Sequence, residues 1–227
     1  MAVNEEVYKE ITDELYASKV TLVAVSKTKP AEDIQALYNL GQRDFGENYV
    51  QEITEKQPEL PADIRWHFIG HLQSNKVKYI APFVYLIHGV DSEKLLQEIN
   101  KQAAKNNRVI HCLLQIHIAQ EETKFGLDAE ELQQLLTSIV SYPEQWSHIH
   151  IDGLMGMASF SYDAQKVRGE FQYIHQLFQQ HQALSTSNCQ LQTLSMGMSG
   201  DYKMAVEEGS TMVRIGSLLF GKREYNK

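Results

Sequence analysis

The sequence predicts a closed barrel of eight parallel strands, each followed by a helix. Eight short apolar runs alternate with stretches whose apolar residues recur every three or four positions. Strict strand–helix alternation is typical of a parallel sheet covered by helices, and eight units in 227 residues match a (β/α)8 barrel. No linker divides the chain, so we expect one domain over residues 1–227. An open, doubly wound sheet is the alternative, but where its dinucleotide-binding form carries a glycine fingerprint this chain has SKTKP.

Four strands are predicted in the first part of the chain, at residues 20–27, 43–48, 65–70 and 83–90. An additional helix precedes them, with apolar residues at helical spacing: Val3, Val7, Ile11 and Leu15. Pro30 opens the helix after the first strand, and Gly41 ends it. We expect Asn48 and Gln51 to cap the helix after the second strand. A short helix through SNKVKYIA follows the third strand.

Four more strands are predicted at residues 110–118, 149–157, 191–198 and 210–221. Ser92 caps the helix that leads to this group. Asp128 and Glu131 form a capping-box pattern before the next helix, and Asp163 begins a long one. A last helix is predicted over about residues 201–208, before Gly209.

The charge balance argues against two classes of partner. The chain has 29 acidic and 21 basic side chains, whereas nucleic acids and anionic membranes select proteins with surplus Lys and Arg. The acidic N-terminus lacks the pattern of a secretory signal, and no apolar run approaches the ~20 residues that span a bilayer. We therefore expect a cytoplasmic protein that binds neither nucleic acid nor membrane. Without a long apolar edge or a heptad repeat, we expect a monomer.

Cysteine and histidine spacing indicates neither a disulfide framework nor a metal site. Cys112 and Cys189 lie in apolar surroundings without CxxC spacing, as expected in a reducing compartment. His148 and His150 share one face of a predicted strand, but no third ligand stands nearby, so we expect no bound metal.

The ends of the last two strands carry hydroxyls and glycines. SMGMS places Ser195 and Ser199 around a glycine just before a helix, and RIGS places Gly216 and Ser217 after the last strand. In barrels of this class, the carboxyl ends of the strands hold the chemistry, and the seventh and eighth often bind phosphate. Either stretch alone could be an ordinary cap with a turn glycine. Together they favour a phosphate site.

The first strand ends in two lysines, Lys27 and Lys29. Alternation along the strand points Lys27 inward at the rim, beside the proposed phosphate site, because barrel closure places the first strand next to the last. Partial desolvation and a second nearby cation both favour the free amine that imine formation requires. The alternative is an ordinary solvated lysine. Because the two lysines are two positions apart and fall on the same face, spacing does not show which of them is the reactive one. A reactive amine beside a phosphate site indicates a phosphorylated aldehyde or ketone: pyridoxal phosphate or a sugar phosphate.

Five ordered motifs make the sequence similar to the pyridoxal phosphate homeostasis protein family. They are AVSKTKP, FGENYVQE, WHFIGHLQSNK, GLMGMA and LSMGMSGDYKMAVEEGSTMVRIGSLLFG, and the match runs from about residue 20 to 225. The resemblance implies a single barrel of the alanine racemase N-terminal type that binds pyridoxal 5′-phosphate.

The resemblance also implies roles for individual residues. Lys27 is then the residue that holds the cofactor as an internal aldimine, and Arg214 faces the pyridine nitrogen. Asn48 lies by the cofactor ring. The phosphate-binding set is Ser195, Ser199, Gly216 and Ser217. HFIGHLQSNK is a family signature that lines the mouth, within which His67 could touch the ring, and Lys124 is a weaker candidate at the entrance.

The residue expected at the pyridine nitrogen argues against an enzyme. Racemisation and transamination pass through a carbanion that a protonated pyridine nitrogen stabilises, and Arg214 acts only as a donor. Racemisation also needs a second base, and no obvious one is present. We therefore expect a non-catalytic protein that buffers or delivers pyridoxal phosphate in vitamin B6 homeostasis, with apo-enzymes as recipients. The alternatives are an amino-acid racemase or similar enzyme, and a Schiff-base aldolase acting on a sugar phosphate.

Overall fold

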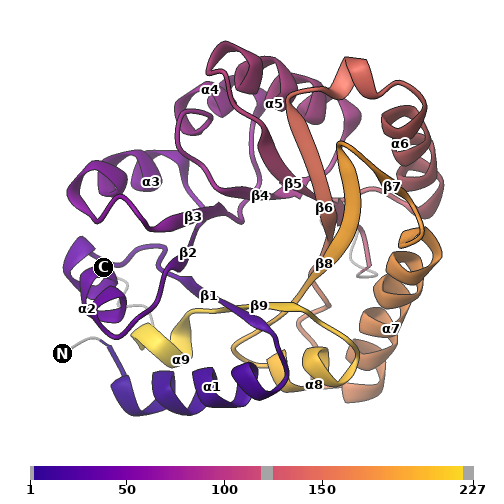
Figure 1. The fold of residues 1–227 in the computed structure, drawn as a ribbon. Helices are drawn as coiled ribbons and strands as arrows, with labels where there is room; N and C mark the ends of the chain where they lie inside the picture. Colours follow the sequence, from indigo (N-terminus) through magenta and orange to yellow (C-terminus); the bar gives the residue numbers. More distant parts are fainter. Residues whose placement is uncertain (1–2, 119–124, 222–227) are drawn as a thin grey trace.

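Eight parallel strands close into a barrel in the computed structural model, which describes residues 3–118 and 125–221 (Figure 1). The barrel strands are β1 (Thr21–Val25), β2 (Asp44–Glu47), β3 (Arg65–Phe68), β4 (Leu86–Val90), β5 (Ile110–Ile116), β6 (Ile149–Gly156), β8 (Cys189–Met198) and β9 (Met212–Ile215). Consecutive barrel strands pair in parallel, and β9 pairs with β1 to close the cylinder. The predicted fold class is confirmed.

Helices form a ring outside the strands (Figure 1). They are α1 (Glu5–Ala17), α2 (Ala31–Asn39), α3 (Val50–Lys56), α4 (Val77–Ile80), α5 (Glu93–Lys105), α6 (Ala129–Ser141), α7 (Ala164–His181), α8 (Tyr202–Glu207) and α9 (Ser217–Phe220), with 3-10 turns at Gln57–Glu59, Ser74–Lys76 and Pro143–Trp146. The predicted caps Ser92 and Asp163 both accept hydrogen bonds from their helices. The capping box of Asp128 and Glu131 is formed by both side chains.

Two local predictions are wrong, and one element was not predicted. Tyr49 is the residue before α3, and no side chain caps this helix, because Asn48 lies at a cavity instead. The last predicted strand stops at Ile215, and its apolar tail folds into α9. A short strand that the sequence did not predict, β7 (Ser185–Thr186), pairs antiparallel with the start of β8.

The barrel buries two unequal apolar layers. The larger layer lies between the strands and the helices and includes Leu22 and Ala24 of β1. The smaller lies inside the barrel: Val23, Leu86, Leu113, Met155 and Met212. The alternation predicted for the first strand is thus confirmed. So few apolar residues do not fill the barrel, and buried polar side chains occupy much of the remaining interior.

The helix that precedes the barrel takes the place of a long helix after the last strand. α9 has only four residues, and α1 packs against it and against β1. The Asn4 amide donates to the Leu219 carbonyl oxygen at 2.8 Å, which ties the start of α1 to α9. Among the described residues, no helix has the length and apolar character needed to cross a membrane.

Candidate ligand site at the carboxyl ends of the strands

A cavity of about 470 Å³ opens at the carboxyl ends of β1, β2, β8 and β9. It gathers six of the seven residues predicted for the site: Lys27, Asn48, Ser199, Arg214, Gly216 and Ser217. The seventh, Ser195, is fully buried and does not line the cavity. Such a volume falls within the range of small-molecule sites, about 300–1,000 Å³.

The two lysines reach the cavity from a tight turn after β1. The Lys29 amide donates to the Ser26 carbonyl oxygen at 3.0 Å, and Thr28 between the lysines has a φ of 64°. Such a left-handed conformation is uncommon outside glycine and must be held by its surroundings. Here the Thr28 amide donates to Glu52 Oε2 at 2.7 Å. The turn lets Lys27 and Lys29 line the same cavity.

A buried ion pair holds this turn from behind. Lys56 Nζ lies 2.8 Å from Glu47 Oε1 and 2.8 Å from Glu52 Oε2, and donates to the Ser26 carbonyl oxygen at 3.1 Å. The Ser26 hydroxyl donates to the same Glu47 oxygen at 2.7 Å. Burial raises the pKa of Glu47, against the charge and hydrogen bond of Lys56. The end of β1 is therefore fixed by its neighbours on α3 and β2.

Lys29 is engaged with the opposite wall of the cavity. Its ammonium donates to the Phe220 carbonyl oxygen at 2.7 Å, at the end of α9. This contact ties the turn after β1 to the short helix that carries Ser217. Lys29 therefore has a structural role, which spacing in the sequence could not reveal.

Hydroxyls and backbone amides form the wall contributed by β8 and β9. The Gly216 amide donates to Ser199 Oγ at 3.2 Å, so the two predicted motifs meet in space. Gly197 has a φ of 93°, and a Cβ there would lie 2.6 Å from the Ala205 side chain. This glycine lets β8 turn sharply and bring Ser199 to the cavity. The Ser217 side chain lines the same wall.

Arg214 enters the cavity from the barrel interior, and three hydrogen bonds fix its guanidinium. Nη1 donates to the Ser195 carbonyl oxygen at 2.9 Å and to Ser195 Oγ at 2.7 Å, and Nη2 donates to the Gly156 carbonyl oxygen at 3.1 Å. Burial lowers the pKa of Arg214 to about 10, against the charge of Asp201. Arg214 therefore stays cationic at neutral pH and acts only as a donor.

A chain of buried polar groups runs from Arg214 to the other end of the barrel. Ser195 Oγ lies 3.2 Å from His88 Nδ1, and His88 Nε2 lies 2.9 Å from His67 Nδ1. His67 Nε2 in turn lies 2.9 Å from Asp44 Oδ1. Both oxygens of Asp44 accept hydrogen bonds from Arg65, at the lower rim. Five strands contribute one residue each to the buried part of this chain.

The hydrogen bonds in this chain can all run in one direction. Burial, helped by the nearby charge of Arg214, keeps the pKa of His88 well below its ordinary value, so this imidazole is neutral. Because Arg214 donates to Ser195 Oγ, the Ser195 proton points to His88 Nδ1, and His88 donates from Nε2 to His67. His67 then donates to Asp44. The chain of hydrogen bonds thus connects the Arg214 cation to the Asp44 carboxylate, and every ring nitrogen of the two histidines takes part in it.

Two residues that were expected at the ligand are instead part of this chain of hydrogen bonds. His67 is fully buried among polar partners and does not line the cavity, so it does not reach a ring bound there. Ser195 orients Arg214 from below, and its assignment to a phosphate stays an untested prediction. The signature containing His67 still contributes Ile69 to the cavity. Lys124, the entrance candidate, lies outside the described residues.

Asn48 carries a buried acceptor that lacks a partner. Its Oδ1 atom is buried without a hydrogen bond in the structure, although the side chain lines the cavity. Unpaired buried polar atoms cost about 1–3 kcal/mol and are rare outside functional sites. A Cβ at Gly70 would collide with the Asn48 backbone, so this glycine allows the end of β2 to sit where it does.

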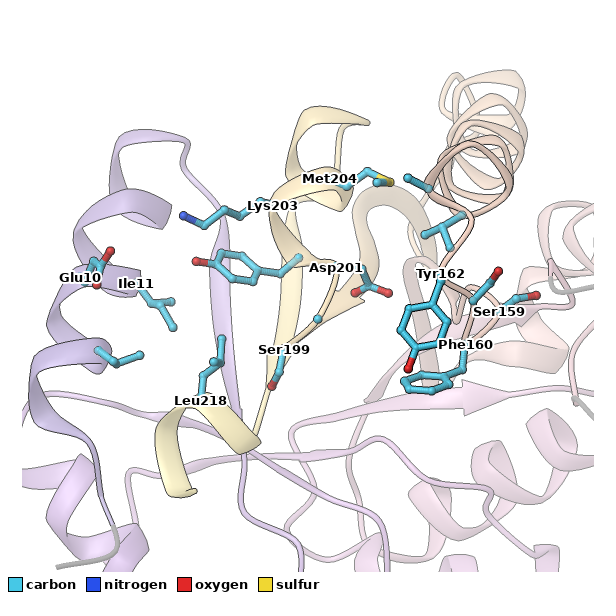
Figure 2. A pocket seen from close by; sticks show the side chains of 16 residues that line it. Glu10, Ile11, Ser159, Phe160, Tyr162, Ser199, Asp201, Lys203, Met204 and Leu218 are labelled. Atoms are coloured by element: carbon cyan, nitrogen blue, oxygen red, sulfur yellow. The ribbon is translucent and has the colours of Figure 1, made fainter. Parts of the chain in front are cut away.

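A second, larger pocket adjoins the first. It has a volume of about 700 Å³ and shares Phe160, Ser199, Gly200 and Asp201 with the cavity above. Figure 2 shows its two sides, with Glu10 and Ile11 of α1 facing Tyr162 and Phe160 across Asp201. Burial raises the pKa of the Asp201 carboxyl, while a hydrogen bond from the Met198 amide and the charge of Arg214 lower it. The exposed Phe160 ring thus marks the common mouth of both spaces.

Comparison with known proteins agrees with this geometry. The family model of the alanine racemase N-terminal domain matches residues 5–224. A protein of Aquifex aeolicus named pyridoxal phosphate homeostasis protein is 42% identical over 205 residues, which cover 90% of this chain and 87% of the relative. A human protein of the same name is 38% identical, covering 100% of this chain and 86% of the relative.

Solved structures show the same likeness. PipY of Synechococcus elongatus, determined without PLP, superposes with a TM-score of 0.88 at 36% identity, covering 95% of this chain and 99% of PipY. The PipY structure with PLP bound gives a TM-score of 0.83 over the same shares of the two chains.

Proposed function

This chain belongs to the pyridoxal phosphate homeostasis protein family, built on the alanine racemase N-terminal domain, and we propose that it binds pyridoxal 5′-phosphate and acts in vitamin B6 homeostasis. The observation that carries the proposal is the single cavity that unites Lys27, Asn48, Arg214 and Ser199 from four strand ends. PipY, which shares the fold at 36% identity, was determined with PLP bound.

The residues present fit this cofactor chemically. The cavity offers a primary amine at one wall and two hydroxyls with a glycine amide at the other. Lys27, Lys29 and Arg214 give it a positive character that suits a phosphorylated ligand, although the chain as a whole is acidic. The buried Asn48 Oδ1 has no hydrogen-bond partner in the structure, and its side chain lines the cavity, which adds a polar group to this wall. The bound cofactor supplies an aldehyde that condenses reversibly with an amine, and a ring that accepts electrons.

We assign the chain's residues the following tasks. Lys27 is the covalent anchor, because it lines the cavity and the matching family motif gives the role to the first lysine. Ser199, Gly216 and Ser217 hold the phosphate. Arg214 donates to the ring nitrogen and keeps it from taking up a proton.

Retention of the cofactor, more than turnover, suits this site. An arginine at the ring nitrogen weakens the electron sink on which racemases and transaminases depend. The relatives are named for homeostasis. We propose that the protein buffers pyridoxal phosphate and releases it to apo-enzymes in the reducing cytoplasm, consistent with the buried free thiols of Cys112 and Cys189.

The cofactor and its lysine are tested together by chemical trapping. Freshly purified protein should absorb as a lysine-bound pyridoxal compound, and borohydride reduction followed by peptide mapping should place the label on Lys27. The matched control is Lys29→Ala, which removes the neighbouring lysine of the same cavity and should leave the label on Lys27. A Lys27→Ala protein that keeps its colour after dialysis would refute the assignment.

A weak enzyme is the second candidate, and Asp201 favours it. Its carboxyl lines the cavity, and burial raises its pKa, so it could exchange a proton at the α-carbon of an amino acid. Incubation with single L-amino acids in deuterated water separates the two. Imine exchange without α-deuterium indicates the carrier, whereas deuterium incorporation that Asp201→Asn abolishes indicates the enzyme.

Delivery has its own test. The loaded protein is mixed with increasing concentrations of a PLP-dependent apo-enzyme, and the rate of enzyme activation is compared with spontaneous loss of cofactor to a scavenger. A rate that rises above spontaneous release supports direct transfer. A rate capped at spontaneous release indicates that the protein acts only as a buffer. Sedimentation of the same samples tests the expected monomer.

A further inference from the structure

Two histidines and an aspartate converge at the end of the barrel opposite the cofactor cavity. His111 lies near the start of β5, and His150 and Asp152 lie near the start of β6. His111 Nδ1 is 2.8 Å from Asp152 Oδ1 and 2.9 Å from Oδ2, and His150 Nδ1 is 2.6 Å from Oδ1. Within residues 3–118 and 125–221, this is the one group of three His, Cys, Asp or Glu side chains with ligand atoms all within 4.8 Å.

The sheet builds this cluster by register and by a bulge. His111 pairs directly with His150 across the two parallel strands, so the rings lie side by side with centroids 5.2 Å apart. The register then shifts, because Cys112 pairs with Ile151 but Leu113 pairs with Gly153. Asp152 is therefore the extra residue of β6. Alternation along β6 places its carboxylate on the same side as the His150 ring, and the bulge leaves Asp152 without a pairing partner on β5.

The third ligand that sequence spacing did not provide is thus supplied by the fold. The sequence paired His148 with His150 and found no companion, but the partner of His150 is His111, 39 positions earlier in the chain, along with Asp152. All three side chains are partly exposed, by 46% for His111, 22% for His150 and 26% for Asp152. An ion can therefore reach the cluster from solvent.

We propose that His111, His150 and Asp152 bind a divalent transition-metal ion of the zinc type at the amino end of the barrel. Two imidazole nitrogens and a carboxylate oxygen are preferred ligands of zinc, with water at the fourth position. Tetrahedral zinc with bonds of about 2.0–2.1 Å separates its ligand atoms by roughly 3.3 Å. The present separations between the imidazole nitrogens and the Asp152 oxygens are 2.6–2.9 Å, and the ligand atoms of all three residues lie within 4.8 Å of one another, close to that arrangement.

Other ions and other ligands fit less well. Magnesium and calcium prefer all-oxygen sites, which two imidazoles do not provide. The two cysteines near this end are poor competitors, because both side chains are buried. The Arg108 guanidinium, whose charge also acts on His111, donates to the Ala81 and Val84 carbonyl oxygens. Its charge opposes a cation, so we expect micromolar affinity instead of the much tighter binding of closed structural sites.

The bound ion would join β5 and β6 where their pairing slips. A site at this end of a barrel is expected to serve stability, since catalysis lies at the carboxyl ends of the strands. The ion would take the place of the ring protons that now lie between the two histidines and Asp152, and its bonds to these side chains would crosslink the two strands. It is a structural ion, independent of the cofactor function proposed above.

Zinc titration of the full chain tests the site. Protein freed of metal by a chelator is titrated with Zn²⁺ by calorimetry, and one equivalent should bind. Asp152→Asn preserves shape but removes the anionic ligand and should weaken binding at least about 100-fold, beyond the 10–100-fold typical of residues behind a ligand. His148→Asn is the matched control, because this histidine lies two residues before His150 and outside the cluster. It should bind Zn²⁺ like the wild type.

A spectroscopic measurement on the wild-type protein tests the site without depending on whether a variant folds. Co²⁺ added in place of Zn²⁺ should give the visible spectrum of nitrogen and oxygen ligands, without a thiolate band. Absence of saturable binding, equal binding by wild type and Asp152→Asn, or a thiolate band from Cys112 or Cys189 would each overturn the site.

Discussion

At the scale of single residues, Arg214 is held in place before a ligand binds. Its three hydrogen bonds to Ser195 and Gly156 set the plane of the guanidinium, and His88 behind Ser195 fixes the hydroxyl. Pre-set donors lose little entropy on binding. Under the proposed function, Ser195 would act on the cofactor ring through Arg214, whereas Ser199 at the cavity wall would act on the phosphate.

Replacing Ser195 or Ser199 should change the affinities for pyridoxal phosphate and for unphosphorylated pyridoxal in different ways. Ser199→Ala should weaken pyridoxal phosphate binding by roughly 10-fold and leave unphosphorylated pyridoxal nearly unchanged, because it removes one hydrogen bond to an anion. Ser195→Ala should weaken both ligands by similar factors, since it loosens Arg214 and leaves His88 Nδ1 without its donor. Fluorescence or absorbance titration of both ligands measures the factors. A loss confined to the phosphorylated form in Ser195→Ala would place Ser195 at the phosphate.

Asp44 makes stability depend on acid pH. Burial by itself would raise its pKa, but hydrogen bonds from Arg65 and His67 outweigh it and lower the pKa to about 2 from an ordinary 3.8. The ionised form thus stabilises the fold above pH 3.8, and this contribution is lost as the pH falls through about 2. Asp44→Asn should lower the free energy of unfolding by about 2 kcal/mol at pH 7 and by roughly half of that at pH 3, as measured by urea unfolding. Asp13→Asn, on the exposed side of α1, should change little.

The sequence could name the surface-facing part of the site but not the buried chain. Strand ends are recognisable, so Lys27, Ser199 and Gly216 follow from where apolar runs stop. Strand parity places His67 and His88 inside, but the partner of each lies on a different strand, 21 or more positions away. Only the closed barrel fixes which interior polar groups meet.

At the scale of elements, the ion pair between Lys56 and Glu47 joins α3 to β2 and to the turn after β1. Lys56 contacts two carboxylates and the Ser26 carbonyl, and Glu47 is fully buried. Removing one member of such a pair leaves a buried charge without compensation, which costs about 3–5 kcal/mol. The position of Lys27, the proposed anchor, therefore depends on a helix that does not line the cavity.

Lys56→Met should destabilise the protein by about 3 kcal/mol at neutral pH. The loss of Lys56 raises the pKa of Glu47 further, so the deficit is smallest below pH 4.5 and grows as the pH rises. Guanidine unfolding at pH 5 and pH 8 measures it. The double variant Glu47→Gln/Lys56→Met should recover most of the loss, and a double variant as unstable as the single one would refute the buried-charge explanation.

Element boundaries show which sequence signals are reliable. Ser92, Asp128 and Asp163 were predicted as caps and are caps, because nothing competes for their side chains. Asn48 has the right chemistry for a cap but lies at the cavity, so α3 begins without one. The apolar tail of the last predicted strand forms α9, because Gly216 ends β9 and α1 offers a surface on which a helix packs.

At the scale of the whole molecule, the two ends of one barrel carry separate tasks. The cofactor cavity lies at the carboxyl ends of β1, β2, β8 and β9, and the proposed metal cluster lies at the amino ends of β5 and β6. The described network that crosses the interior ends at Asp44 and Arg65, on β2 and β3, and shares no member with the metal cluster. Among the described residues, no chain of side-chain hydrogen bonds therefore links the two sites.

Thermal unfolding with both ligands should therefore show additive shifts. Each ligand at about 100 times its Kd should raise Tm by roughly 5–10 °C, and effects of sites without shared partners add. Asp152→Asn should abolish the zinc shift and keep the full pyridoxal phosphate shift, while Lys27→Ala should do the reverse. Scanning fluorimetry of the three proteins, with each ligand alone and with both, measures this. A zinc shift that depends on bound cofactor would show that the two ends are coupled through the strands, because only the β-sheet connects them.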